Sequence, residues 1–529
     1  MLLLLVAARV PSLAQPAGGD QSLYTYQAQR MLDGGVPYRD AWDQKPPAVF
    51  FIYAALWRIW PHESVVAAAD LAAAALTAWL LVILGRRWFG QPVGLIAAGL
   101  FLLLADPSIQ RHGGLTVRAQ CETFIALAVT AALVALTSRP RRSWRLMMAG
   151  VWLGVACWLK YNAAVFALPV GLATVLWTAE PAPGSTPDSR RRWADLATVG
   201  AGVVMVSLAM LAYFAAHGAL DDLRRATIDY NLQYSGETYG GISGPIGYLF
   251  AMPFERARVD LLWFLGLLGA LVLATRLREH GAGWMVLAWI AASAVSIAIN
   301  GARGLPQYFV QATPAFALAA AAGIALAWRA QGAWRLAMAA VALVGLWRVG
   351  TEATPLWRPR LGGVPQIAAN LSLDLQALTG RVDRRQYLTR FGGTGDTGKF
   401  SAVAVDDLAA RVRQSTTEAD AILVFGFSGG GVLAKSSRVS ASRFFWSRPV
   451  VVEFARGVPG YGSAGLLEDL RQRPPALVAL QKRDRRIGEP GVPNSLEFFM
   501  STGPLRQWLE AAYTLEDDGA VFAVWRRRS

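Results

Sequence analysis

Long apolar segments recur through the first 350 residues of the chain. Segments close to the roughly 20 apolar residues that a helix needs to cross a bilayer lie near residues 63–85, 91–106, 119–137, 195–216, 259–275, 283–299, 308–328 and 334–349. The stretch 146–177 is too long for one crossing and has Lys160 and Asn162 near its middle, so it predicts two short spans. MLLLLVAAR resembles the end of a first span whose beginning is expected to be truncated. The chain is therefore predicted to be a polytopic α-helical membrane protein with about eleven spans.

The composition agrees with a membrane protein. Hydrophobic residues make up 54% of the chain and charged residues only 16%, against about 25% charged residues in soluble domains. The net charge of +15 would suggest nucleic-acid binding in a soluble protein. Here arginines beside membrane spans explain that charge, and no nucleic-acid partner is expected. The two cysteines and four histidines favour neither a disulfide framework nor a histidine metal site.

Arginine density predicts the orientation of the spans. Alternate short loops are dense in arginine, at residues 85–90, 138–145, 189–193, 275–280 and 328–335. Because arginine-rich short loops tend to stay in the cytoplasm, this set is predicted to be cytoplasmic. Residues 9–62 and everything after Arg348 are then expected to lie outside, as for a multi-pass protein of a bacterial inner membrane.

The tail, residues 351–529, differs in character from the membrane part, residues 1–350. It has no long apolar run and alternates strand-like segments (421–427, 475–480 and 520–527) with a helical segment (402–415). This pattern predicts an extracytoplasmic α/β domain. The segment GFSGGGV after the first strand lacks the spacing of a phosphate-binding or dinucleotide-binding loop, so a plain turn is favoured.

The first outer loop is unusually polar for its position. Residues 21–33 have helical propensity and end at a glycine pair, and residues 48–60 are apolar and aromatic but too short to cross. Two helices lying along the membrane surface are therefore expected. Asp20 precedes the first helix, where it could be an N-cap or a reactive acid. Tyr38 is one of several aromatic residues that suit the boundary and could stack on sugars (the others are Tyr24, Tyr26, Trp42 and Tyr53).

Charged residues in the outer loops are the candidates for chemistry. Asp40 and Asp43 could be loop caps or substrate contacts, and Lys45 before Pro46–Pro47 could contact a lipid phosphate or ordinary headgroups. In the second outer loop Glu122 lies at the mouth of a span, where an acid needs a partner or a function. The i−4 spacing favours Arg118 as that partner. Further outer-face cations are Arg111, Lys160 and Arg303.

These features together resemble one family. The series is an outer aspartate, the loop GGVPYRDAWDQKPP, an acid in QCETF, the lysine of WLKYN and the turn RGLPQYFVQATPA. It is similar to the polytopic glycosyltransferases of the GT-C superfamily, and within them to bacterial proteins resembling protein O-mannosyltransferases and the lipid A aminoarabinose transferase. The resemblance covers roughly residues 1–350. This chain has Asp20–Gln21 where many relatives have an aspartate and a glutamate.

The resemblance implies an inverting transfer of a sugar from a polyprenyl-phosphate donor to an acceptor hydroxyl at the outer face. Asp20 would be the general base, Glu122 the second-loop acid, and Lys45 the cation at the donor phosphate. The remaining implied substrate contacts are Tyr38, Asp40, Asp43, Arg111, Arg118, Lys160, Arg303 and Tyr308.

The resemblance also implies the partners. They are the lipid-linked donor, a lipid, glycan or protein acceptor, and membrane lipids. No cofactor is expected, and the loss of one acid at Gln21 weakens a metal-bridged mechanism, although a divalent metal is not excluded. A transporter or flippase for lipid-linked glycans, a glycan ligase and an inactive receptor are the alternatives.

Overall fold

The computed structural model describes residues 2–105, 117–140, 142–177, 189–236, 243–278, 281–300, 304–329, 332–350, 363–397, 400–484 and 493–528. Contacts divide the chain into two compact units. The first unit comprises Met1–Leu13, Ala67–Tyr213 and Gln233–Leu375, and the second comprises Ala14–Val66, Phe214–Leu232 and Gln376–Ser529. The second unit thus joins the first outer loop to the C-terminal segment. The expected domain boundary at residue 350 stays a prediction.

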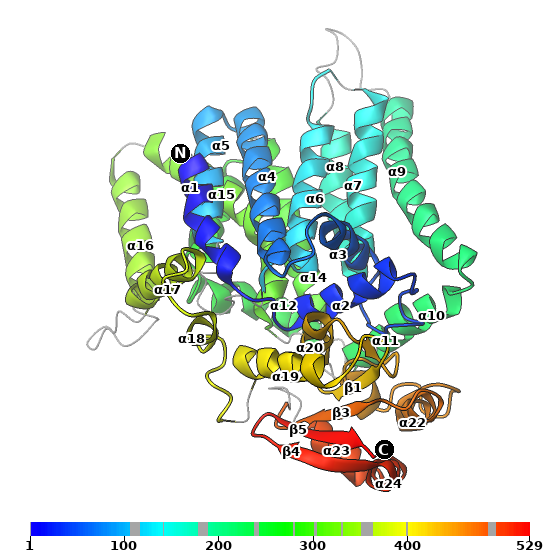
Figure 1. Ribbon diagram of the computed structural model, residues 1–529. Helices are drawn as coiled ribbons and strands as arrows, with labels where there is room; N and C mark the ends of the chain where they lie inside the picture. Colours follow the sequence, from blue (N-terminus) through cyan, green and yellow to red (C-terminus); the bar gives the residue numbers. More distant parts are fainter. Residues whose placement is uncertain are drawn as a thin grey trace. The chain divides into compact units, whose positions relative to one another are not determined.

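The first unit is built from apolar helices (Figure 1). Its helices are α1 (Leu2–Arg9), α4 (Ser64–Trp88), α5 (Gln91–Leu104), α6 (Cys121–Leu136), α7 (Ser143–Leu159), α8 (Ala167–Leu176), α9 (Ser189–Ala216), α12 (Ser243–Ala257), α13 (Leu261–Thr275), α14 (Ala282–Ile299), α15 (Thr313–Arg329), α16 (Ala333–Gly350) and α17 (Gly363–Leu378). Short 3₁₀ helices, η3 (Tyr161–Phe166) and η5 (Pro306–Ala312), precede α8 and α15. Most of these bounds follow the predicted apolar segments, whereas α12 and α17 were not predicted.

Small residues let helices of the first unit approach each other. A Cβ added to Gly269 of α13 would lie 2.1 Å from the carbonyl oxygen of Ala319 in α15. A Cβ on Gly323 of α15 would lie 2.6 Å from the Cα of Gly269. Close packing of this kind replaces the hydrophobic driving force that lipid cannot provide between helices.

The predicted break in the stretch 146–177 is confirmed. Helix α7 ends at Leu159, Lys160 has an extended backbone, and η3 follows at Tyr161. Asn162 donates hydrogen bonds to the carbonyl and hydroxyl oxygens of Ser296 in α14. The polar side chains that interrupt the apolar run are thus satisfied inside the helical unit.

The number of spans stays a prediction. Among the described residues, four helices are long and apolar enough to cross a membrane: Ser64–Trp88, Arg190–Ala216, Ala282–Ile299 and Pro306–Arg329. The bent pair Ser243–Ala257 and Leu261–Thr275, with an angle of 114°, would make a fifth. The other apolar helices have 10–17 residues, which is shorter than an upright crossing requires.

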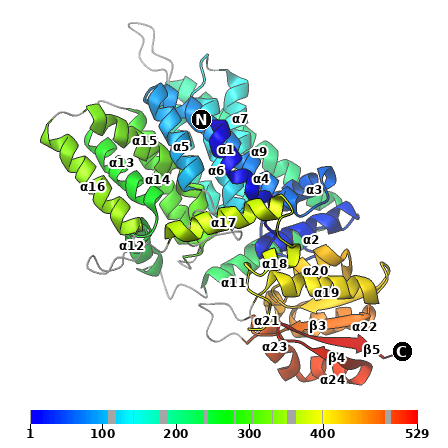
Figure 2. The same ribbon diagram turned by 60° about the vertical axis from the view of Figure 1, so that its left-hand side comes forward.

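The C-terminal part of the second unit contains a five-stranded sheet in the order β2-β1-β3-β5-β4 (Figures 1 and 2). The strands are β1 (Ala421–Phe425), β2 (Val439–Ser440), β3 (Leu477–Gln481), β4 (Tyr513–Asp518) and β5 (Phe522–Arg527). Strand β1 runs parallel to β2 and β3, whereas β5 is antiparallel to β3 and β4. The three expected strands and the α/β class are therefore present.

Helices cover both faces of this sheet. Helices α19 and α20 lie on one side and α23 and α24 on the other in both views (Figures 1 and 2). The helices of this part are α18 (Arg384–Leu388), α19 (Ala402–Ser415), α20 (Gly429–Ser436), α21 (Arg448–Val451), α22 (Gly462–Gln472), α23 (Ser495–Ser501) and α24 (Gly503–Ala512). The expected helix 402–415 is confirmed.

Both expected helices of the first outer loop exist, as α2 (Asp20–Leu32) and α3 (Ala48–Ile59). Residues 21–28 of α2 are all buried, because α2 packs on α3 and α20. Protein therefore covers much of the surface that an interfacial helix would offer to lipid. For α3, whose last turn is exposed, a place at the membrane surface stays a prediction.

The glycine segment after β1 packs against α2. A turn at Phe427–Ser428 is followed directly by α20, which begins at Gly429. A Cβ on Gly430 would lie 2.8 Å from Cδ2 and 3.1 Å from Cα of Leu23, so the absence of a side chain at Gly430 allows this close contact. The expected turn is present, and its glycines bring a helix of the outer loop onto the sheet domain.

Candidate functional site

Asp20 and Lys45 form a pair within the second unit. The Asp20 Oδ2 atom lies 3.6 Å from Lys45 Nζ, and the two side chains are 18% and 15% exposed. The expected N-cap role of Asp20 is wrong, because α2 begins at Asp20 itself and Gly19, with a φ of 50°, occupies the cap position. Asp20 thus faces a cation instead of the helix backbone.

Gln21 stabilises the start of α2. Its side chain is buried, and its Oε1 accepts a hydrogen bond of 3.0 Å from the backbone N–H of Gly18. An amide oxygen does this without a charge. Glutamine at position 21, where the resemblance implies a glutamate, therefore has a local structural role. Asp20 is then the acid that faces Lys45.

Side chains of neighbouring residues bond both the carbonyl oxygen and the N–H of Lys45. The Tyr38 hydroxyl donates to the Lys45 carbonyl oxygen at 2.7 Å, and the Lys45 N–H donates to Asp43 Oδ1 at 2.9 Å. The Tyr38 ring is fully buried against Phe50 and Phe214. In this structure Tyr38 therefore positions Lys45, and protein covers both faces of its ring. The same burial applies to the other aromatic residues of the loop, Tyr24, Tyr26, Trp42 and Tyr53.

Asp43 is a buried carboxyl beside this pair. Its residue is 1% exposed, and burial raises its pKa to about 7, although the charge of Lys45 acts in the opposite direction. A carboxyl with a pKa near the working pH can accept or release a proton. Asp40 is different, because it is exposed and its Oδ2 accepts a 2.6 Å hydrogen bond from the N–H of Val36. The loop-cap interpretation therefore fits Asp40.

A second polar cluster lies in the first unit. Glu122, in the first turn of α6, accepts a 2.5 Å hydrogen bond from Lys160 Nζ, and both side chains are at least nine-tenths buried. The Lys160 ammonium also lies 4.2 Å from the centre of the Tyr308 ring in η5. Three predicted residues from distant parts of the sequence therefore come together. A buried acid requires such a partner.

The partner of Glu122 differs from the sequence-based expectation. Arg118 precedes α6, which begins at Cys121, so the helical i−4 spacing does not apply. Arg118 Nη1 lies 3.8 Å from Asp70 Oδ2 of α4, and Asp70 Oδ1 accepts a 2.8 Å hydrogen bond from the N–H of Ala119. Asp70 was visible in the sequence as a charge within a span, but the partner it meets is 48 residues away.

The predicted contacts Arg111 and Arg303 lie outside the described residues. Within the described residues, no three His, Cys, Asp or Glu side chains are grouped so that they could hold a metal ion. The expectation that the chain needs no cofactor stays a prediction.

Comparisons with known proteins show what the chain is similar to. Residues 44–210 match the sequence model of a family described as dolichyl-phosphate-mannose-protein mannosyltransferase. The fold is similar to that of ArnT from Cupriavidus metallidurans bound to undecaprenyl phosphate, with a TM-score of 0.55, 15% identity, and coverage of 99% of this chain and 97% of that chain. The resemblance to the GT-C glycosyltransferases is confirmed. Apo ArnT from the same organism gives a TM-score of 0.57 at 16% identity with the same coverage.

Another solved structure with a similar fold is an oligosaccharyltransferase from Archaeoglobus fulgidus in its apo form. The TM-score is 0.51 at 13% identity, and the match covers 91% of this chain and 69% of that chain. No curated protein sequence matches significantly. The apolar helices and the GT-C fold together identify a multi-pass membrane protein.

The matched range of the GT-C family contains only part of the predicted site. It includes Lys45, Glu122 and Lys160, whereas Asp20 and Tyr308 lie outside residues 44–210. The roles of these two residues therefore depend on their geometry. Sequence reasoning identified Asp43 as a candidate but missed that its carboxyl is buried, because nothing in WDQKPP shows what packs against it.

Proposed function

We propose that this chain is an inverting glycosyltransferase that moves a sugar from a polyprenyl-phosphate donor to an acceptor hydroxyl at the outer face of a bacterial inner membrane. The observation that carries this proposal is the fold shared with ArnT over 99% of the chain, together with the match to a mannosyltransferase family model. The charged pair Asp20–Lys45 provides the two kinds of group that the reaction requires.

In the proposed reaction the donor competes with Asp20 for Lys45. Inversion requires that the acceptor oxygen attacks one face of the anomeric carbon while the phosphate leaves from the other. A base and a phosphate-binding cation must therefore be further apart during transfer than the 3.6 Å that separates Asp20 and Lys45 here. The donor phosphate would bind the ammonium group of Lys45 in place of Asp20. The carboxylate of Asp20 would then accept the proton of the acceptor hydroxyl.

The Glu122–Lys160 pair has a different proposed role. The close contact with Lys160 compensates the charge of Glu122 inside the first unit. We assign to the pair the positioning of the start of α6 and of the break after α7. Asp43 is the alternative base, and Arg111, Arg118, Arg303 and Tyr308 remain proposed contacts of the donor or acceptor.

The test is a transfer assay with purified protein in proteoliposomes. Radiolabelled polyprenyl-phosphate sugars that differ in the sugar are supplied with a total membrane-glycolipid and protein fraction as acceptor. The expected result is that label from one donor becomes covalently attached to an acceptor, and that Asp20→Asn abolishes the transfer. Movement of intact donor between leaflets without a new covalent product would instead identify a flippase.

A second candidate is the transfer of a preassembled glycan. The fold similarity to an oligosaccharyltransferase favours keeping this candidate. Adding radiolabelled lipid-linked oligosaccharides to the same assay separates the two, because a ligase would use these donors and leave lipid-linked single sugars unused.

A further inference from the structure

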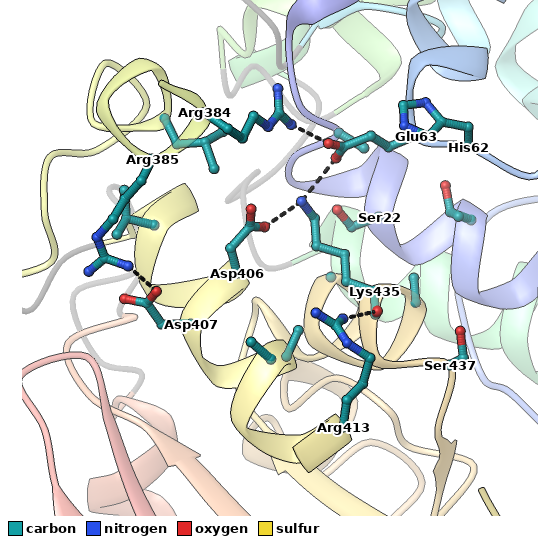
Figure 3. Close-up of a pocket in the computed structure, with 18 of the residues that line it drawn as sticks. Ser22, His62, Glu63, Arg384, Arg385, Asp406, Asp407, Arg413, Lys435 and Ser437 are labelled. Carbon is teal, nitrogen blue, oxygen red and sulfur yellow. Dashed lines mark hydrogen bonds and ion pairs between the residues drawn. The ribbon is translucent and has the colours of Figure 1, made fainter. Parts of the chain in front are cut away.

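A large pocket lined by both charged and apolar residues lies within the second unit, apart from the Asp20–Lys45 pair. It has a volume of about 630 Å³, within the range of roughly 300–1,000 Å³ typical of small-molecule sites. Figure 3 shows that its walls come from the connection after α3, from α18 and α19, and from α20. Asp20, Asp43 and Lys45 are not among its described lining residues.

The charges around this pocket are equal in number, and most of them are paired with one another. Four basic and four acidic side chains line it. Glu63 contacts both Arg384 and Lys435, Lys435 also contacts Asp406, and Arg385 contacts Asp407 (Figure 3).

The two remaining charged side chains of the wall bond to neutral backbone groups. Arg413 donates to the carbonyl oxygen of Lys435, and Asp383 accepts from the N–H of Gln386. These bonds do not neutralise either charge, but the equal number of basic and acidic side chains leaves the described Lys, Arg, Asp and Glu residues of the wall with no net charge.

Glu63 is the centre of this network. Burial acts to raise its pKa, but Lys435 and Arg384 outweigh burial and hold the pKa below its usual value. Glu63 is thus ionised at neutral pH, and the network keeps its charges.

The paired groups still have hydrogen-bonding capacity. Each carboxylate can accept about four hydrogen bonds and each guanidinium can donate five. Asp407 and Arg385, which both line the pocket, are 48% and 64% exposed, so they can form further hydrogen bonds while they remain paired. The hydroxyl groups of Ser22 and Ser437 add groups that can both donate and accept, whereas the Thr25 hydroxyl donates to the Gln21 carbonyl oxygen and adds an acceptor.

An apolar surface completes the wall. Trp57, half-buried in α3, lines the pocket beside Pro61 and His62. An indole ring offers a flat apolar face on which the C–H face of a pyranose ring can pack, while the hydroxyls at the ring edge meet polar groups. A ligand that satisfies this wall has one apolar face, many hydroxyls and no net charge.

We propose that this pocket binds a neutral, hydroxyl-rich carbohydrate of two or three sugar units, with one ring packed on Trp57 and its hydroxyls bound by the paired charges of α18 and α19. Binding at the pocket does not require the transfer reaction. Identifying the bound glycan as the acceptor of the transfer is a further step, and this step rests on the proposed function.

The test measures binding directly with full-length protein in nanodiscs. Mannotriose, maltotriose and chitotriose are titrated by calorimetry and by saturation-transfer NMR, with anionic sialyllactose for comparison. At least one neutral trisaccharide should bind at millimolar concentration or below. Absence of binding by all three, or binding of sialyllactose alone, would overturn the proposal.

Variants with matched controls place the ligand. Trp57→Ala should abolish detectable binding, whereas Trp508→Ala, a half-buried tryptophan that stacks on Tyr513 outside the pocket, should not change it. Asp407→Asn should weaken binding by about tenfold, since a hydrogen bond to a charged group has roughly that effect. Its control is Asp517→Asn, whose side chain is 47% exposed and paired with Arg411.

The outcomes separate this proposal from the proposed function. Asp407 pairs at the surface, where an ion pair contributes little to stability, so Asp407→Asn should fold even if Trp57→Ala does not. Unchanged trisaccharide binding in both folded variants would exclude the pocket as the site. Asp20→Asn should keep trisaccharide binding while losing transfer, so a loss of transfer alone leaves the pocket proposal standing.

Discussion

Replacement of Asp20 by asparagine distinguishes a structural ion pair from a catalytic base. Asparagine keeps the size of the side chain and removes its charge. Asp20 Oδ2 and Lys45 Nζ are 3.6 Å apart, and two unit charges at this distance attract by about 4–5 kcal/mol at an effective dielectric of about 20. Lost hydration offsets most of that attraction. For a pair with side chains 18% and 15% exposed, a net loss of about 1–3 kcal/mol of folding free energy is expected.

Asp20→Asn should affect the turnover rate more strongly than the folding free energy. General base catalysis contributes about 10²–10⁴-fold in rate, which corresponds to about 3–5 kcal/mol in the activation barrier. Asp20→Asn should therefore lose turnover by that factor in the proteoliposome assay, while its thermal unfolding midpoint falls by only a few degrees. Lys45→Met is the informative partner variant, because it breaks the same pair but keeps the carboxylate.

The control for the loss of an acid is Asp33→Asn at the end of the same helix. Asp33 is 62% exposed and paired with Arg30, so both stability and turnover should stay close to wild type. Turnover of Asp20→Asn within about threefold of wild type, far from the 10²-fold expected of a lost base, would refute the catalytic assignment. The base would then be sought first at Asp43.

Three further residues and the topology give separate predictions. Lys45→Met should raise the KM for the donor, measured in the transfer assay with a folded variant, and an unchanged KM would argue against a phosphate contact. Glu122→Gln leaves the buried Lys160 ammonium without its anion and should cost about 3–5 kcal/mol in thermal or denaturant unfolding; the double variant with Lys160→Met should recover part of the loss. Burial raises the pKa of Asp43 from 3.8 to about 7, so the folded chain holds a proton that the unfolded chain has released. Stability should therefore fall as pH rises from about 4 to about 7, and Asp43→Asn should remove that slope in midpoint-against-pH measurements. A reporter fused after residue 360 should be active as periplasmic alkaline phosphatase and dark as a cytoplasmic fluorescent protein, and the opposite result would reverse the predicted orientation.

Local patterns in the sequence were sufficient for most helices and for three of the strands. The apolar segments, the break at Lys160 and the helix 402–415 depend on neighbouring residues, and the structure has them where they were expected. Strand β4 was missed because its residues after Tyr513 are all exposed and, apart from Leu515, polar, so they lack the apolar pattern that identifies a strand.

Pairing between distant residues could not be predicted in the same way. Glu122 was expected to meet the nearby Arg118, but the fold brings Lys160 to it from 38 residues away. A partner of this kind depends on how helices pack, and helical spacing within one segment contains no information about it. The same holds for Asp43, whose raised pKa comes from burial by other segments.

The sequence motif identified the polar loop, and the tertiary structure determined what surrounds it. The motif GGVPYRDAWDQKPP pointed to Lys45 because residue types and their spacing are written in the chain. Tyr26 accepts a hydrogen bond from the N–H of Ser440, and Trp446 donates to the carbonyl oxygen of Trp42. These contacts join segments more than 400 residues apart, and only folding brings such segments together. The pocket beside Glu63 and Lys435 arises for the same reason, because residues within 17–63 and residues within 383–437 line it together.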